Sequence, residues 1–280
     1  MKGDEGLHAT STMLAWVDGS DVVVQPFASP GARRAIGKTD GAHPQVFVGT
    51  GNVFWYRGSD GAILRSSLEG AGVSIVAHNF KNLGWWHTDR ALFVHDGGRR
   101  ICISPDATIT ALTRPASEYE TIGGDCESWV MLTEEEIVVH DSGAERTFAA
   151  LLGTSSLVHR DREHGFAVLD GCRVGKGCDN DARLVKLDLG TGAVETVHTL
   201  NGLTVSAGAW SGRSLVLATY RKGTFDDGRL WHFTDDGQLK CFYQTGARVT
   251  AVARHGSAAI WRTSTGQISH GEPTVTACSQ

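Results

Sequence analysis

The chain has 280 residues, which is enough for one large domain or two ordinary ones. Gly is abundant at 35 residues, Pro is scarce at 6, and 41% of residues are hydrophobic, a balance that fits a folded all-β protein and argues against disorder. The formal net charge is −5 with acids and bases interleaved, so no basic stripe supports a nucleic-acid partner, and no apolar run approaches the length of a membrane span.

One short apolar segment recurs along the chain, and it is apolar on both faces, as expected when each sheet lies between two neighbours. The segments are Met13–Val17, Val53–Tyr56, Ala91–Val94, Trp129–Leu132, Phe166–Leu169, Leu215–Ala218 and Ala258–Trp261. Their central residues are 39, 38, 38, 37, 49 and 43 residues apart. A near-constant step indicates an internal repeat, here of seven units.

Each recurring segment is the second of four strands in its unit. First strands are expected at 7–10, 44–49, 84–88, 119–124, 155–160, 205–210 and 249–254. Third strands are expected at 21–27, 62–67, 99–104, 136–141, 183–189, 229–233 and 267–272. Fourth strands are expected at 32–37, 73–78, 108–113, 146–151, 193–200, 239–243 and 274–279. The intervening turns carry Gly, Asp or Ser-Pro, which supply the backbone angles that tight hairpins need.

The pattern predicts an all-β fold, a seven-bladed β-propeller of four-stranded antiparallel blades that forms one domain over residues 1–280. The alternative is a stack of two β-sandwiches, which the regular steps disfavour. Residues 7–10 are the only candidates for the first strand of the first blade, and 274–279 supply a fourth strand to the last. We therefore expect the ring to close without a strand shared between its ends.

Two hairpins resemble those of known bacterial repeat families. Lys186–Val197 is similar to the strand–turn–strand pattern of the WD40-like, quinoprotein-like and TolB-like propellers. Ile103–Leu112 resembles their Ser-Pro-Asp-Gly hairpin, with Ala107 in place of the usual Gly. The Gly-His and Trp-Asp signatures of true WD40 repeats are absent. The resemblance therefore implies a fold and no particular activity.

Cysteine usage bears on the compartment. Cys172 and Cys178 lie close together in a polar loop, and we predict a disulfide between them, with two free surface thiols as the alternative. A disulfide would imply an oxidising, extracytoplasmic location, either periplasmic or secreted. Residues 1–11 lack the apolar core of a signal peptide, which does not decide the question. The remaining four cysteines allow three pairings: Cys102, Cys126, Cys241 and Cys278.

Two loops depart from the repeat, and both join a second strand to a third. They are Gly171–Ala182 in the fifth unit and Arg221–Gly228 in the sixth, so propeller topology puts them on the same face as the inter-blade loop His78–Trp86. Long loops on a rigid scaffold often carry binding, although neutral drift would also lengthen them. The candidate binding residues on this face are Trp85, Trp86, His87, Arg173, Lys176, Asp179, Asp181, Arg221, Lys222, Asp226 and Asp227.

Adjacent tryptophans open the first strand of the third unit. Trp85 and Trp86 cannot both face one side of a strand, so one is expected to pack inward while the other faces the channel mouth. An exposed Trp beside His87 would suit a sugar or an aromatic ligand. The alternative is that both rings belong to the core.

No metal or cofactor is expected. Asp179, Asp181, Asp226 and Asp227 carry oxygen ligands of the kind that suits Ca²⁺, but their spacing matches no known calcium loop, and Asp favours turns on its own account. No Cys-x-x-Cys spacing supports zinc, and no Gly-x-Ser-x-Gly elbow supports a hydrolase triad. Several histidines near first strands would allow a metal ring at the channel, yet they fall on different units.

We therefore predict a non-catalytic binding or scaffold propeller that recognises a protein or glycan on the face with the long loops. It would act as a monomer or as part of a larger assembly. The alternative is an extracytoplasmic hydrolase or lyase with its active site at the channel mouth on that face. An enzyme would gather strongly perturbed acids or histidines in one axial pocket, whereas a binding module would show an exposed aromatic or apolar rim.

Overall fold

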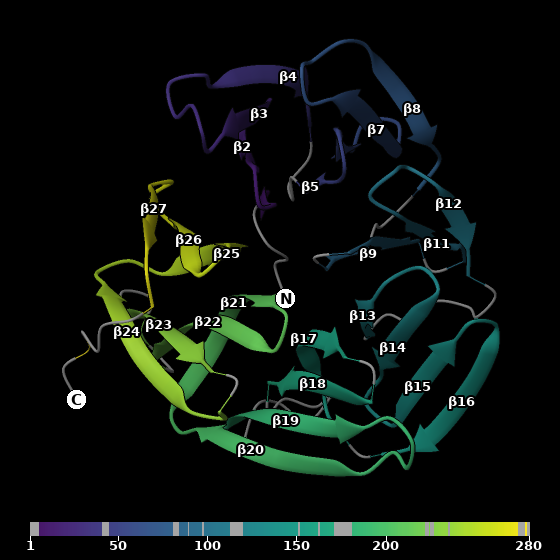
Figure 1. Ribbon diagram of the computed structural model, residues 1–280, viewed down its shortest axis with the longest axis vertical. Helices are drawn as coiled ribbons and strands as arrows, with labels where there is room; N and C mark the ends of the chain where they lie inside the picture. The colour runs from purple at the N-terminus through teal and green to yellow at the C-terminus, as the bar shows by residue number, and fades with distance from the viewer. Residues whose placement is uncertain are drawn as a thin grey trace.

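The protein is all-β, and its sheets form a ring around a central axis (Figure 1). The computed structural model describes residues 6–40, 45–80, 84–88, 90–96, 98–112, 120–150, 152–161, 163–170, 181–221, 224, 227–234, 236–273 and 278. None of these residues lies in a helix, so nothing in the described ranges could cross a bilayer as a long apolar helix.

Blades one to four are four-stranded antiparallel sheets, each built from consecutive strands. Blade one contains β1 (Leu7–Ala9), β2 (Met13–Asp18), β3 (Asp21–Pro26) and β4 (Arg34–Lys38). Blade two contains β5 (Val46–Val48), β6 (Asn52–Arg57), β7 (Ala62–Ser67) and β8 (Val73–Ala77). Blade three contains β9 (Gly84–His87), β10 (Leu92–His95), β11 (Arg100–Ile103) and β12 (Ile109–Ala111). Blade four contains β13 (Thr121–Gly124), β14 (Ser128–Leu132), β15 (Glu136–Asp141) and β16 (Ala144–Ala149).

Blades five to seven continue the ring. Blade five contains β17 (Ser155–Arg160), β18 (His164–Leu169), β19 (Ala182–Asp188) and β20 (Val194–Leu200). Blade six contains β21 (Leu203–Ser211), β22 (Ser214–Arg221), β23 (Gly228–Phe233) and β24 (Leu239–Thr245). In the described residues blade seven contains three strands, β25 (Val249–His255), β26 (Ala258–Thr263) and β27 (Ile268–Gly271). The chain is a seven-bladed β-propeller.

Every blade runs outward from the axis in chain order, with its first strand inside and its last strand outside (Figure 1). Blade one is completed by β1, which pairs with β2 as the sequence predicted. The predicted fourth strand of blade seven, 274–279, lies outside the described residues except for Cys278. That all 280 residues form one domain stays a prediction.

The core is divided among the gaps between blades. The described residues form seven buried clusters, and each cluster joins a different pair of neighbouring blades. Ala15 and Trp16 of β2 point to opposite sides, so Ala15 packs against blade two while Trp16 packs against Ala251 and Ile260 of blade seven. The four second-strand tryptophans are buried core residues: Trp16, Trp55, Trp129 and Trp261.

Two disulfides resolve the pairing that the sequence left open. Cys102 of β11 is bonded to Cys126 in the β13–β14 turn, with a Cα separation of 5.4 Å, and joins blade three to blade four. Cys241 of β24 is bonded to Cys278, with a Cα separation of 5.7 Å. Disulfides persist in oxidising compartments, so the two bonds are consistent with a location outside the cytoplasm. The predicted Cys172–Cys178 bond lies outside the described residues and stays a prediction.

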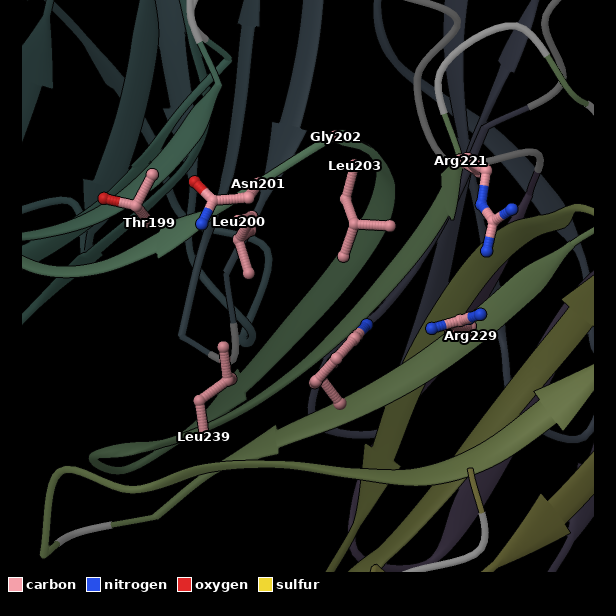
Figure 2. Close-up of a pocket in the computed structure, with 9 residues that line it drawn as sticks. Thr199, Leu200, Asn201, Gly202, Leu203, Arg221, Arg229 and Leu239 are labelled. Atoms are coloured by element: carbon pink, nitrogen blue, oxygen red, sulfur yellow. The ribbon is translucent and has the colours of Figure 1, made fainter. Parts of the chain in front are cut away.

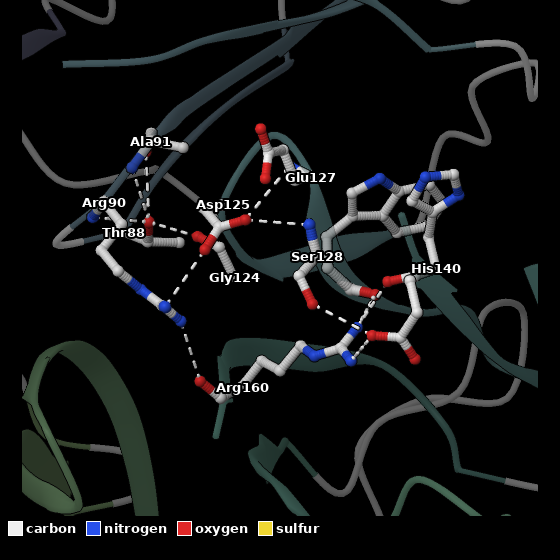
Figure 3. A network of polar contacts seen from close by, with 11 residues as sticks. Thr88, Arg90, Ala91, Gly124, Asp125, Glu127, Ser128, His140 and Arg160 are labelled. Carbon is white, nitrogen blue, oxygen red and sulfur yellow. Dashed lines mark hydrogen bonds and ion pairs between the residues drawn. The ribbon is translucent and has the colours of Figure 1, made fainter. Parts of the chain in front are cut away.

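A polar network joins blades three, four and five on the face that carries the β13–β14 turn (Figure 3). The buried Arg160 of β17 donates to two backbone carbonyls of blade four, at 2.9 and 2.6 Å, and pairs with Asp141. Arg90 reaches from blade three to Asp125 of blade four (3.1 Å) and to the carbonyl of Arg160 (3.2 Å). These contacts satisfy groups at the blade ends, so we assign this region a structural role.

Candidate functional site

The two lengthened loops leave the sheets at the same face of the ring. One connects β18 to β19 and the other connects β22 to β23, and both are second-to-third-strand connections of neighbouring blades. Of the candidate residues on this face, the structure describes Trp85, Trp86, His87, Asp181, Arg221 and Asp227. The other candidates lie outside the described residues: Arg173, Lys176, Asp179, Lys222 and Asp226.

The aromatic candidates of β9 are not gathered with the loops of blades five and six. Trp85 is 8% exposed and packs in the cluster between blades two and three. Trp86 is half-buried on the opposite side of the strand, where its ring stacks on His95 with centroids 4.6 Å apart. His87 contacts His8 of blade one, with ring centroids 4.6 Å apart. Both tryptophans therefore contribute to packing around β9, which matches the core alternative.

A groove lies between blade five and blade six, and Arg221 of the candidate set forms part of its wall (Figure 2). Its volume is about 390 Å³. One wall is the link from β20 to β21, residues 199–203, and the other comes from β22, β23 and the start of β24. The side chains that give the groove its character are Leu200, Leu203, Arg221, Arg229, Trp231 and Leu239.

Charge is concentrated at the end of the groove nearest the blade-six loop. Arg229 pairs with Oδ2 of Asp227 at 3.2 Å, and Arg221 lies 3.8 Å from the same oxygen. Gln244 also donates to Asp227, at 2.9 Å. The Arg229 side chain is only 15% exposed, whereas that of Arg221 is 63% exposed. A single carboxylate thus contacts two arginines, of which Arg221 is mostly exposed; Figure 2 shows the positions of the two arginine side chains.

Two hydrogen bonds fix the groove walls. The carboxylate of Asp181 accepts from the backbone N–H of Gly202 at 2.9 Å and pins the β20–β21 link. The indole N–H of Trp231 donates to the hydroxyl of Thr219 at 2.8 Å and orients the half-buried ring. Arg221 therefore lines the groove, whereas Asp181 and Asp227 contact residues that line it, Gly202 and Arg229.

Sequence reasoning missed the remaining groove residues. Arg229 and Trp231 belong to a third strand, and Leu203 and Leu239 each begin a strand, so all four look like ordinary blade residues. The only available signal was the alternation of β23, which sends Arg229 and Trp231 to the same side.

Three ionisable groups in three different blades have perturbed pKa values. Burial, together with the neighbouring His87, holds the pKa of His8 in blade one well below its ordinary value. Burial, with the nearby Arg100, lowers the pKa of His95 in blade three to about 4. Burial raises the pKa of Asp170 in blade five to about 6. Among the described residues, no three His, Cys, Asp or Glu side chains are grouped so as to hold a metal ion.

No family model and no curated protein matches the chain. Solved structures match most of it at low identity. The β-propeller domain of the Trilobed protease from Pyrococcus furiosus, with an open velcro topology, has a TM-score of 0.66 at 11% identity and 98% coverage of both chains.

A chain in the structure of the mitotic checkpoint complex has a TM-score of 0.66 at 13% identity, with 96% of this chain and 90% of that chain covered. Acylaminoacyl peptidase from Pyrococcus horikoshii has a TM-score of 0.67 at 11% identity, with 97% of this chain covered but only 52% of the peptidase. Identities this low establish similarity of fold alone.

Proposed function

We propose that the protein is a non-catalytic recognition propeller, which binds a protein partner on the face that carries the blade-five and blade-six loops. The observation that carries the proposal is the groove beside those loops, which combines an exposed guanidinium at Arg221 with apolar side chains at Leu203 and Leu239. Interfaces commonly combine such an arginine with buried apolar contacts. A propeller of similar fold is part of the mitotic checkpoint complex, so this fold serves in protein assemblies.

The residues that line the groove support binding over catalysis. The groove itself is lined by arginine and apolar side chains, with Asp227 engaged by both arginines. The structures of similar fold include parts of peptidases as well as a chain of the mitotic checkpoint complex, so they do not choose between binding and hydrolysis. The disulfides favour a periplasmic or secreted protein.

An unbiased selection tests the proposal. The full chain is used to select peptides from a random display library, and the same protein is applied to a glycan array. A variant in which the 171–182 and 221–228 loops are shortened to tight turns is tested in parallel. We expect peptides that bind the parent and not the variant. Far-UV circular dichroism checks that the variant is folded, because the shortening also removes Asp181 and Asp227, which contact Gly202 and Arg229.

The control is a charge change on the opposite face of the same blade. Arg213 immediately precedes β22 and Arg221 ends it, and their side chains are 64% and 63% exposed. Arg213→Gln should leave peptide binding intact. Peptides that bind the loop-shortened variant as well as they bind the parent would contradict the choice of face, and binding to glycans alone would contradict a protein partner.

A further inference from the structure

We infer that the groove between blades five and six is a carboxylate-binding site for an extended acidic segment of the protein partner, with Arg221 as the carboxylate ligand and the adjoining apolar wall as the site for a neighbouring side chain. The inference rests on the proposed function and adds the chemistry of the ligand. Two features support it independently: the charge balance at the groove mouth and the prearranged apolar wall.

The three charged groups that contact one another at the mouth, Arg221, Arg229 and Asp227, sum to a formal charge of +1, and the two arginines are not equally neutralised. Asp227 forms its shorter contacts with Arg229 (3.2 Å) and Gln244 (2.9 Å), and it lies 3.8 Å from Arg221. Arg229 is therefore largely neutralised and buried, whereas Arg221 is held only loosely and stays 63% exposed. A guanidinium presents parallel N–H donors that match a carboxylate, so Arg221 can take a second acid in a two-point contact.

A singly charged ligand fits this balance better than a phosphate. The segment from Arg221 to Arg229 contains two arginines, one lysine and two aspartates, so its formal charge is also +1. A phosphate ester carries about −1.5 to −2 near neutral pH and would bring its excess charge close to Asp227. A carboxylate would neutralise the group formed by Arg221, Arg229 and Asp227.

The apolar wall gives the ligand its second contact. Leu203 and Leu239 are half-buried and line the groove, as does Trp231, whose indole is already fixed by Thr219. Asp181 holds the β20–β21 link through Gly202, so the wall is ordered without a ligand. Because these elements are prearranged, binding would lose little side-chain entropy. The groove volume of about 390 Å³ lies in the range of roughly 300–1,000 Å³ that is usual for ligand sites.

The test uses three short probes that differ at one position: acetyl-Gly-Ser-Asp-Leu-Phe-Gly-amide, the same peptide with Asn for Asp, and the same peptide with phosphoserine for Asp. Binding to the ¹⁵N-labelled full chain is followed at the indole N–H signal of Trp231, which is assigned by comparison with Trp231→Phe. We expect the Asp probe to bind about tenfold more tightly than the Asn probe, as one charge-assisted contact predicts.

Arg221→Gln should reduce this ratio to about one, and Arg213→Gln should leave it unchanged. Raising sodium chloride from about 50 to about 500 mM should weaken the Asp probe and barely affect the Asn probe, because screening acts on the charged contact. Equal binding of the Asp and Asn probes, or an equal effect of the two arginine variants, would overturn the inference. Tighter binding of the phosphoserine probe would identify a phosphate site instead.

The two proposals fail in different ways. If display peptides bind the parent and lose binding on loop shortening, but the Asp probe shows no preference, the carboxylate site is wrong and the recognition face stands. If no peptide depends on the loops, the recognition face is wrong as well. Far-UV circular dichroism of Arg221→Gln checks that the variant is folded.

Discussion

The Cys102–Cys126 disulfide is predicted to contribute substantially to stability, and its size can be worked out from the chain. The two residues are 24 positions apart, so the bond closes a loop of moderate length in the unfolded chain. In the chain-entropy treatment, a loop of this length stabilises the folded state by about 3.5 kcal/mol. In a protein of this size that loss should lower the Tm by roughly 7–14 °C. Cys102→Ala with Cys126→Ala is the corresponding variant.

Guanidinium chloride unfolding, followed by tryptophan fluorescence, measures the effect. Because the bond acts mainly on the unfolded chain, its removal should lower the midpoint and also raise the m-value, since the unfolded state becomes more expanded. Cys102→Ser with Cys126→Ser is the matched comparison, because it removes the same bond, leaves Cys241–Cys278 intact and fills more of the space at the buried Cys102 than Ala does. An unchanged midpoint in both samples would refute the reasoning.

Three further outcomes are expected. Glu120→Gln removes one partner of the buried ion pair with Arg100, in which both side chains are 1% exposed, and should lower the free energy of unfolding in urea by about 3–5 kcal/mol. Replacing both residues by Met should lower it much less, and equal losses in the two variants would contradict this account. Between pH 6.5 and about 4 the unfolded chain binds a proton at His95 that the folded chain does not, so the contribution of His95 to stability is present above pH 6.5 and is lost as the pH falls. His95→Phe should therefore flatten the dependence of Tm on pH in this window, and a slope equal to that of the parent would contradict the argument. Gly123→Ala would put a Cβ 2.4 Å from the backbone oxygen of Val158 and should lower stability by about 1–3 kcal/mol, so a thermal melt like that of the parent would show that blades four and five can separate without penalty.

The fold was predictable because its signals are local and repeated. Successive side chains of each second strand, such as Ala15 and Trp16, pack against different neighbouring blades, so both faces of the strand are buried. The result is a continuous apolar run in the sequence that recurs at a near-constant step. Turn residues divide the remaining strands. The confirmed seven-bladed ring follows from these two patterns without knowledge of any distant contact.

The candidate site was predictable only in part, because a groove depends on which side chains of different blades meet. Asp181, Arg221 and Asp227 were found since they lie in or beside loops that break the repeat. Arg229 and Trp231 were missed because nothing in a regular third strand distinguishes a groove residue from a core residue. That any of these residues bind a partner stays a prediction.

Cysteine pairing was not predictable for a related reason. Cys102 lies in a third strand and Cys126 in a turn of the next blade. Their distance depends on how two sheets are rotated against each other, a quantity that strand periodicity does not contain. Cys278 follows the last described strand by several residues, so its pairing with Cys241 has no counterpart in the repeat.

The contiguous construction of the blades has a consequence for synthesis on the ribosome. Among the described residues each sheet is built from consecutive strands, so it can form as soon as those residues emerge. The contact between blades one and seven forms last, so Leu14 and Trp16 remain uncovered until Ala251 and Ile260 arrive. During that interval the nascent protein exposes a broad apolar sheet face, which is the stage at which chaperone binding or aggregation of the unfinished ring would occur.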